Sequence, residues 1–294
     1  MKLDGEALKE GVTVADGGWS TQLQVRGLAV SVMAETASCT HPELVVDLGR
    51  DYVEAGARFI TTNTFAANQL NVERRRIKLT VAELNRAGAE LAREAVGDSG
   101  ALVAGSIGPS GKILAVREAT EAQLMSLFEE QAKSLADGGV DVIVLETFSE
   151  MAEILLALKV VKDATGLPVI GSMSFDSGPQ RTRTMMGALA GDCAAALEDA
   201  GADLVGCNCG SGIEHVLPAV VALRAATELP LWVKPNAGLP ELEDGQTVWK
   251  QTPEEFAAHV PTLLDAGVNI IGGCCGSGPE HIRRVAAVVA KRRT

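Results

Sequence analysis

A short phrase recurs along the chain and constrains its fold more than any other feature. A segment rich in Ala, Leu and Glu with helical spacing ends at a glycine, and an apolar, β-branched run follows. The phrase occurs at positions 55–57, 138–141, 200–203 and 266–269. Glycine at this point is typical of the left-handed residue that closes a helix. A second phrase, Ala-Thr-x-Leu-Pro, precedes further apolar runs at 164–168 and 226–230. The chain therefore alternates helix and strand.

Eight strands are predicted from these recurring phrases, and most of the strands are continuous apolar runs. They are expected at residues 12–16, 58–62, 102–106, 142–146, 169–174, 204–208, 231–235 and 269–273. Continuous apolar strands are typical of parallel sheets buried on both faces. Eight strands that alternate with helices predict an α/β fold of the (β/α)8 TIM barrel type, as a single domain over residues 1–294. A doubly wound open sheet is the alternative, but no Gly-x-Gly-x-x-Gly turn follows the first strand.

Composition excludes several classes of partner. The 294 residues are 47% hydrophobic, which is enough for a large core, and the formal net charge is −12. This acidity argues against nucleic acid or an anionic membrane as a partner. The sequence contains no apolar run of about 18 residues and no signal-like N-terminus, so we expect a cytoplasmic protein. Cysteines stay reduced in that compartment, which favours metal binding or catalysis over disulfides.

Four of the six cysteines lie in two glycine-flanked clusters, 206–210 and 272–276. Three thiolates from two distant segments suit zinc, which binds sulfur in tetrahedral geometry. Cys274 and Cys275 can share one ion only where the strand bends, because successive side chains alternate faces. Spacing alone does not choose between Cys207 and Cys209. A vicinal disulfide, or cysteines that act as small buried hydrophobes, are the alternatives.

Polar and reactive residues fall at the predicted C-terminal strand ends. They are Asp16 at the end of strand one, Asn63 after strand two, Glu146 at the end of strand four, Cys209 after strand six, Asn236 after strand seven, and Cys274 with Cys275 after strand eight. In TIM barrels the active site lies at this end of the strands. Residues far apart in the sequence are thus expected to converge on one mouth.

These motifs together resemble the homocysteine S-methyltransferase family, the zinc-dependent homocysteine-binding barrel of cobalamin-dependent methionine synthase, betaine-homocysteine methyltransferase and S-methylmethionine-dependent enzymes. The matching segments cover nearly the whole chain. They are Asp16-Gly17-Gly18, Thr62-Asn63-Thr64-Phe65, Gly105-Ser106-Ile107-Gly108-Pro109, Glu146-Thr147-Phe148, Gly206-Cys207-Asn208-Cys209, Lys234-Pro235-Asn236-Ala237-Gly238 and Gly273-Cys274-Cys275-Gly276. The resemblance implies an enzyme of methionine biosynthesis that methylates the thiol of homocysteine.

The resemblance also assigns residues to roles. It implies that Cys209, Cys274 and Cys275 bind zinc. It implies that Asp16 and Glu146 hold the α-ammonium group of homocysteine, while backbone amides near Gly17 and Gly18 bind its carboxylate. No other catalytic residue is implied. Cys39 and Cys193 lie outside both clusters and are interpreted as packing residues.

The methyl donor is less constrained. Betaine is held in an aromatic cage by cation-π attraction, and the chain has only one Tyr, three Trp and six Phe. We therefore expect a sulfonium compound, or a corrinoid carried on a separate protein because this chain has no room for a cobalamin domain. Trp19, Asn63 and Asn236 are candidate donor-side groups.

Three alternatives remain at this stage: a betaine-using methyltransferase, a non-catalytic barrel that binds zinc and a thiol, and a zinc lyase or aldolase. The last depends on Lys234, which ends the seventh predicted strand.

Overall fold

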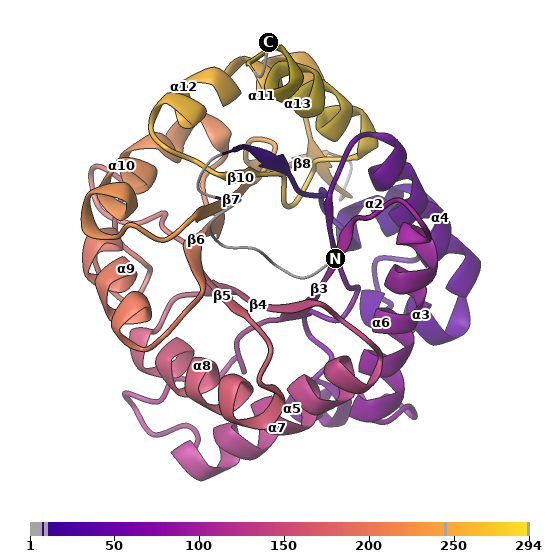
Figure 1. The fold of residues 1–294 in the computed structure, drawn as a ribbon. Coiled ribbons are helices and arrows are strands. Elements are labelled where there is room, and N and C mark those ends of the chain that lie inside the picture. Colours follow the sequence, from indigo (N-terminus) through magenta and orange to yellow (C-terminus); the bar gives the residue numbers. More distant parts are fainter. Residues whose placement is uncertain (1–7, 9–10, 244–245, 293–294) are drawn as a thin grey trace.

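The structure is a computed structural model and describes residue 8, residues 11–243 and residues 246–292. A parallel barrel forms its centre, with helices in a ring outside (Figure 1). The barrel strands are β1 (Thr13–Val14), β2 (Phe59–Thr61), β3 (Leu102–Ile107), β4 (Val142–Phe148), β5 (Val169–Met173), β6 (Leu204–Cys209), β7 (Leu231–Pro235) and β10 (Ile270–Ile271). Each lies within a few residues of its predicted position.

The strands follow the order β1-β10-β7-β6-β5-β4-β3-β2, and all neighbouring pairs are parallel. A parallel bridge between Ala15 and Phe59 joins β1 to β2. The sheet thereby returns to its first strand. The predicted (β/α)8 barrel is confirmed, and the doubly wound alternative is wrong.

Helices connect successive strands on the outside of the barrel. They are α2 (Ser20–Val25), α3 (Ala37–Thr40), α4 (Pro42–Glu54), α5 (Gln69–Arg74), α6 (Val81–Val96), α7 (Glu121–Asp137), α8 (Met151–Thr165), α9 (Ala190–Asp199), α10 (Leu217–Ala226), α11 (Pro253–Ala258), α12 (Val260–Asp265) and α13 (Pro279–Arg292), with 3-10 turns η1 (Ala34–Thr36) and η2 (Ile213–His215). Capping boxes at Thr80, Thr120 and Thr252 begin α6, α7 and α11. Each satisfies backbone N–H groups that a helix start leaves unpaired.

Strand alternation divides the core into two layers. Side chains that point inward fill the barrel, among them Phe59 and Trp232, whose rings pack edge to face at 5.5 Å. Side chains that point outward pack against the helices in a larger cluster. Because both faces of each strand are buried, the strands read as unbroken apolar runs in the sequence.

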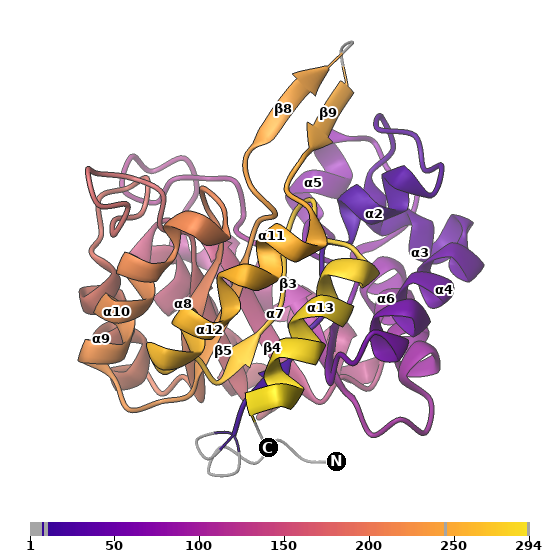
Figure 2. The ribbon, with the colours of Figure 1, turned by 90° about the horizontal axis from the view of Figure 1, so that it is seen from above.

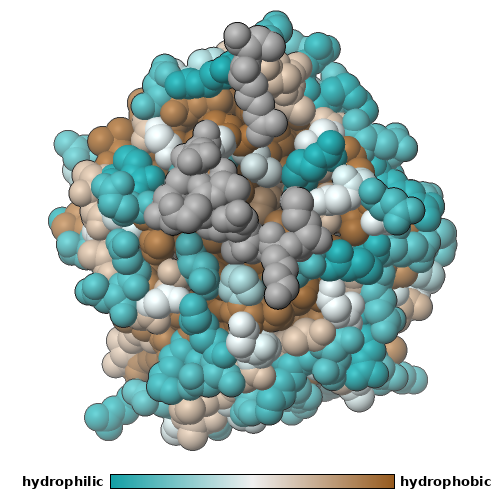
Figure 3. Space-filling view, in the orientation of Figure 1, coloured by the Kyte–Doolittle hydropathy of each residue, from teal (hydrophilic) through white to brown (hydrophobic). Residues whose placement is uncertain are grey.

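One element was not predicted from the sequence. The hairpin β8 (Pro240–Glu243) and β9 (Gln246–Trp249) is antiparallel, and it projects from the barrel on the side of the C-terminal strand ends (Figure 2). The opposite end carries apolar residues near its centre and hydrophilic ones around its periphery (Figure 3). No helix in the described part of the chain is long and apolar enough to cross a membrane.

Candidate active site

A cavity of about 230 Å³ opens at the C-terminal ends of the barrel strands. The turn after β1, the loops after β2 and β10, and the ends of β3, β4, β6 and β7 contribute to its wall. The lining residues are Gly17, Gly18, Trp19, Ser20, Thr21, Glu35, Thr61, Thr62, Asn63, Thr64, Phe65, Ser106, Glu146, Thr147, Cys209, Lys234, Gly273, Cys274 and Cys275. Of the residues expected to converge on one mouth, Asn63, Glu146, Cys209, Cys274 and Cys275 line this cavity, whereas Asp16 and Asn236 do not.

Three cysteine sulfurs form one side of this cavity. The Sγ atoms of Cys209, Cys274 and Cys275 all lie within 4.8 Å of one another, and those of Cys209 and Cys274 are 3.0 Å apart. Each cysteine is partly exposed. Among the described residues this is the group whose geometry could hold a metal ion.

Backbone conformation explains why Cys209, and not Cys207, joins this group. Along β6, Asn208 points into the barrel, whereas Cys207 points outward into the helix-facing core and is 2% exposed. Cys209 would follow Cys207 outward in a regular strand. Instead it has φ 59°, in the left-handed region that non-glycine residues seldom adopt. This turn brings its sulfur to the mouth.

The adjacent cysteines share the cluster because the extended chain ends between them. β10 ends at Ile271, backbone hydrogen bonds to Asp16 and Pro235 continue through Cys274, and the chain turns at Cys275 and at Gly276, which has φ 80°. Asn236, at the end of β7, braces the turn: its Oδ1 accepts from the Cys275 amide (3.0 Å) and its Nδ2 donates to the Gly210 carbonyl (2.9 Å). One side chain therefore connects both cysteine segments.

The thiols influence one another strongly. Cys209 and Cys274 donate hydrogen bonds that lower the pKa of Cys275. The same contacts raise the pKa of Cys209. In the protein alone the cluster thus favours one thiolate stabilised by two thiols, and a bound cation would favour ionisation of all three.

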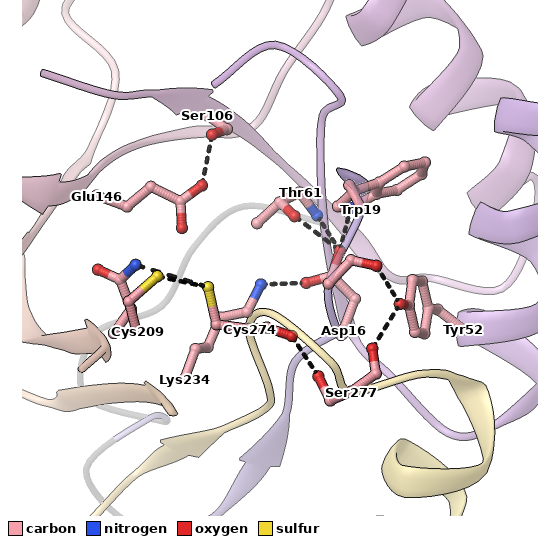
Figure 4. A network of polar contacts seen from close by, with 12 residues as sticks. Asp16, Trp19, Tyr52, Thr61, Ser106, Glu146, Cys209, Lys234, Cys274 and Ser277 are labelled. Atoms are coloured by element: carbon pink, nitrogen blue, oxygen red, sulfur yellow. Dashed lines mark hydrogen bonds and ion pairs between the residues drawn. The ribbon is translucent and has the colours of Figure 1, made fainter. Parts of the chain in front are cut away.

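Asp16 lies at the end of β1 and is fully buried. Its Oδ2 accepts three hydrogen bonds: from the Thr61 amide (2.7 Å), the Thr61 hydroxyl (2.8 Å) and Trp19 Nε1 (2.9 Å). Its Oδ1 is paired with the ammonium group of Lys234. Both oxygens of the carboxylate are therefore engaged within the protein (Figure 4).

Lys234 points from β7 into the barrel and is 2% exposed. Its Nζ also lies 5.5 Å from the centre of the Trp232 ring. Burial opposes its charge, but the nearby carboxylates of Asp16 and Glu146 outweigh that effect, so its pKa is raised. A lysine that stays protonated has no free electron pair to act as a base or to form a Schiff base, which disfavours the lyase or aldolase alternative.

Glu146, near the end of β4, has one oxygen held by the protein and one that is free. Its Oε1 accepts a 2.5 Å hydrogen bond from the Ser106 hydroxyl, while its Oε2 has no partner among the described residues. Burial raises its pKa to about 7, although Lys234 opposes the shift. Thr147, which follows it, has φ 64°. Strain of this kind, about 1–3 kcal/mol, persists where the surrounding structure fixes it.

The turn after β1 packs tightly against the cysteine loop. A Cβ atom on Gly18 would lie 2.6 Å from the Cys274 carbonyl oxygen, and one on Gly17 would lie 2.7 Å from that of Ser277. Only glycine allows this approach. The Gly18 amide donates to the Ser277 carbonyl (2.9 Å), whereas the Gly17 amide makes no hydrogen bond within the described chain.

The three candidate donor-side residues differ in position. Asn63 lines the cavity and donates to the Ala34 carbonyl (2.7 Å). Trp19 lines it too, but its ring packs edge to face against Tyr52 at 6.1 Å. Asn236 braces the cysteine segments, as described above.

Some features were missed or misread from the sequence. Glu35 lines the cavity, and so do Thr61 and Ser106, which hold the two acids. Position at the end of a strand could have indicated Thr61, but nothing in the sequence pattern marks Glu35. Of the two cysteines outside the clusters, Cys193 is buried as expected, whereas Cys39 is exposed, so the packing interpretation of Cys39 is wrong. Cys39 lies on the four-residue helix α3, at the molecular surface.

Comparison with known proteins places this chain in a family. The family described as homocysteine S-methyltransferase matches residues 13–289. Methionine synthase from Mycobacterium tuberculosis is 30% identical over 97% of this chain. Betaine--homocysteine S-methyltransferase 1 from Danio rerio is 32% identical over 96% of this chain and 74% of its own length. The chain belongs to the homocysteine S-methyltransferase family.

A solved structure supports the same grouping. The metallated form of the homocysteine methyltransferase MmuM from Escherichia coli superposes with a TM-score of 0.79 and 26% identity, over 94% of this chain and 96% of that one. By contrast, this chain spans only 25% of the length of the mycobacterial methionine synthase.

Proposed function

We propose that this protein is a zinc-dependent homocysteine S-methyltransferase, which transfers a methyl group from an activated donor to the thiol of homocysteine and releases methionine. The observation that carries the proposal is one cavity bordered by three clustered cysteine sulfurs and by a buried carboxylate with a free oxygen. Residues 1–294 would form the homocysteine-binding barrel. The six free cysteines suit the reducing cytoplasm.

The cysteine cluster fits zinc in number, ligand type and exposure. Catalytic zinc sites have three protein ligands and one open position. Cys209, Cys274 and Cys275 supply three sulfurs on the wall of the cavity, so the open position would face the substrate. Zinc bound there would keep the homocysteine thiol ionised, because a coordinated thiol is deprotonated and therefore nucleophilic.

The polar groups of the cavity suit the amino-acid part of homocysteine. Glu146 Oε2 is the free acceptor for its ammonium group. Asp16 is already paired with Lys234, so we assign it an indirect role: it fixes Lys234 and Thr61 beside the substrate. The Gly17 amide, together with the turn through Gly18, is the donor proposed for the substrate carboxylate.

These residues would orient the substrate for transfer. With its amino-acid end fixed at Glu146 and Gly17, homocysteine directs its thiol toward the cysteine side of the cavity. Alignment of this kind lowers the barrier because the reacting groups no longer have to find one another. In the transfer, the bond from the methyl group to the donor breaks, and the donor keeps the electron pair. A new carbon–sulfur bond forms on homocysteine.

The donor is proposed to be a sulfonium compound or a methylated corrinoid supplied by a separate protein. A direct assay tests the function and the donor together. Zinc-loaded protein is incubated with homocysteine and, separately, with S-methylmethionine, free methylcobalamin and betaine, and methionine is measured. Release of methionine with a sulfonium compound or methylcobalamin supports the proposal.

Turnover with betaine alone would favour the betaine-using alternative. Homocysteine binding without methionine release from any donor would instead favour a non-catalytic thiol-binding barrel.

A further inference from the structure

Tyr52 is a buried phenol whose hydroxyl the proposed reaction does not use. It lies on α4, is fully buried, and is the one tyrosine in the chain. Its hydroxyl donates to the Gly18 carbonyl (2.7 Å) and lies 3.3 Å from the Ser277 carbonyl (Figure 4). These partners are 34 and 225 positions away in the sequence. One side chain therefore meets both the turn after β1 and the end of the cysteine loop, residues 272–278.

The approach of this hydroxyl depends on a glycine. A Cβ atom on Gly17 would lie 2.8 Å from the Tyr52 oxygen and 2.9 Å from a carbon of its ring. Any larger residue at this position would push the turn and the phenol apart. Gly17 thus allows the hydroxyl to pass beneath the turn and reach Gly18.

Gly18 is held by hydrogen bonds on both of its backbone groups. Its amide donates to the Ser277 carbonyl (2.9 Å), and its carbonyl accepts from Tyr52. Gly18 is buried, and a buried carbonyl that loses its donor is costly. The neighbouring Gly17 amide is the donor proposed for the substrate carboxylate. With Gly18 fixed, this amide keeps one place on the cavity wall.

The same contacts lead to the sulfur cluster. Ser277 is fully buried, and its hydroxyl donates to the Cys274 carbonyl (2.7 Å). Its own carbonyl meets the Gly18 amide and the Tyr52 hydroxyl. Homocysteine is proposed to bind with its carboxylate at Gly17 and its thiol beside the cysteines. Tyr52 therefore lies where it can set the relative position of the two ends of the substrate.

The surroundings keep the hydroxyl a donor and the ring in place. Burial raises the pKa of Tyr52, and the nearby Asp16 carboxylate raises it further, so the phenol stays protonated at neutral pH. The Trp19 ring packs edge to face against the Tyr52 ring at 6.1 Å. Trp19 is itself fixed, because its Nε1 donates to Asp16 (2.9 Å).

We propose that Tyr52 is a positioning residue: its hydroxyl holds the turn after β1 against the cysteine loop and thereby orients the Gly17 amide toward the carboxylate of homocysteine. This inference rests on the proposed function, because it assigns the carboxylate to that turn. The hydroxyl acts through Gly18 and does not itself contact the substrate. Its effect is specific to ligands that carry a carboxylate.

The test uses Tyr52→Phe, which keeps the ring and removes the hydroxyl. Calorimetry on the zinc-loaded protein compares homocysteine with homocysteamine, a thiol amine that lacks the carboxylate. Homocysteine affinity should fall about three- to tenfold, the range that one hydrogen bond typically contributes. Homocysteamine affinity and zinc content should stay unchanged. In turnover the KM for homocysteine should rise with little change in kcat, because the carboxylate is bound alike before and during transfer.

A matched variant controls for the loss of a buried hydroxyl. Ser134 on α7 donates its hydroxyl to the Glu130 carbonyl (2.7 Å), is buried, and does not line the cavity. Ser134→Ala should bind both ligands with wild-type affinity. A carboxylate-dependent loss in Ser134→Ala as well would assign the effect to general destabilisation.

A second measurement needs no substitution. Because Tyr52 is the one tyrosine in the chain, biosynthetic fluorotyrosine labels this site alone. Its fluorine NMR resonance should shift when homocysteine binds and much less when homocysteamine binds. Equal shifts with both ligands would contradict a link between Tyr52 and the carboxylate.

The outcomes separate this inference from the proposed function. Equal losses of affinity for both ligands in Tyr52→Phe, or no loss for either, would overturn the positioning role. Methionine release alongside either result would leave the proposed function standing. A carboxylate-dependent loss in a protein that releases methionine from no donor would support the positioning role and contradict the proposed function.

Discussion

Buried charge is stabilised in different ways on the two sides of the cavity. On the acidic side, Asp16 is neutralised within the protein by Lys234 and by three further donors. On the sulfur side, Cys209, Cys274 and Cys275 interact mainly with one another. Asp16 therefore has all its partners within the protein, whereas the sulfur cluster does not. The difference indicates that the sulfur side is the one that a bound cation would complete.

Glu146 and Glu35 are the exceptions on the acidic side. Both line the cavity. Glu146 has one oxygen held by Ser106 and one without a partner in the described structure, whereas Glu35 is stabilised by the Ala66 amide and by its own backbone amide. Side chains whose hydrogen bonds and ion pairs are all made within the protein maintain the shape of the site. Side chains that keep an acceptor without a partner are available to ligands. This distinction can be tested residue by residue.

The largest effect is expected on the sulfur side. Replacing Cys209, Cys274 or Cys275 by Ser should reduce zinc from about one ion per chain to nearly none, because loss of a ligand exceeds the about 10- to 100-fold effect of altering an outer partner. Metal analysis after dialysis measures this. Cys207→Ala is the control and should retain zinc; loss of zinc in that variant with retention in Cys209→Ser would refute the ligand assignment.

The Asp16 carboxylate is neutralised by Lys234 within the protein, so Asp16→Asn should mainly reduce the free energy of unfolding. It removes the ion-pair partner of the buried Lys234, and breaking a buried pair in this way typically costs about 3–5 kcal/mol. Denaturant unfolding measures the change. The double variant Asp16→Asn/Lys234→Met should recover part of the loss, since neither charge remains. A double variant no more stable than Asp16→Asn would mean that the ion pair is not the cause.

Glu146→Gln should instead affect ligand binding. We expect homocysteine affinity to fall by about 1.5–3 kcal/mol, the value for a hydrogen bond to a charged group. Zinc content and unfolding free energy should change little, as calorimetry, metal analysis and denaturation can establish. Glu153→Gln is a suitable control because Glu153 is also buried but lies off the cavity. Equal affinities in wild type and Glu146→Gln would place the ammonium site elsewhere.

Asn236→Ala tests the brace between the cysteine segments. Its side chain contacts Cys275 and Gly210, so its loss should weaken zinc binding about 10- to 100-fold without removing a ligand. Competition with a chelator gives the affinity. Asn85→Ala, which removes a buried amide on α6 bonded to Ala67 and Val81, should leave zinc affinity unaltered. A comparable loss in both variants would indicate general destabilisation.

The smallest expected effect is a pH dependence. The pKa of Glu146 is raised to about 7 by burial, and only its ionised form attracts an ammonium group. Between pH 8 and pH 6 this ionised fraction falls about tenfold, and homocysteine affinity should fall with it. Ionisation of the substrate thiol makes homocysteine affinity depend on pH in both proteins. The difference between the pH profiles of wild type and Glu146→Gln therefore gives the contribution of the carboxylate. Parallel profiles would contradict the assignment.

Much of the architecture was predictable because it depends on local pattern. Glycine after a helix, continuous apolar runs and their eightfold repetition located each barrel strand to within a few residues. The hairpin β8–β9 was not predicted. Its first strand is fully exposed, so no buried face gives it the apolar run by which the other strands were recognised.

The candidate site was predictable where chemistry and position coincide. Cys274, Cys275 and Glu146 are reactive residues at strand ends, and a barrel gathers strand ends at one mouth. The choice between Cys207 and Cys209 was open from spacing, because alternation places both on one face. The structure separates them through the left-handed backbone of Cys209, a feature that depends on the surrounding loops.

The sequence by itself determined the barrel, its eight strands and several of the reactive groups at its mouth, among them Glu146, Cys274 and Cys275, because these follow from periodicity and residue type. Only the tertiary structure decided how the charges are distributed. Asp16 and Lys234 are 218 positions apart in the sequence, and Glu35 reaches the cavity from a short turn outside the strand pattern. Whether an acid is neutralised or left free depends on neighbours that come together only when the barrel closes.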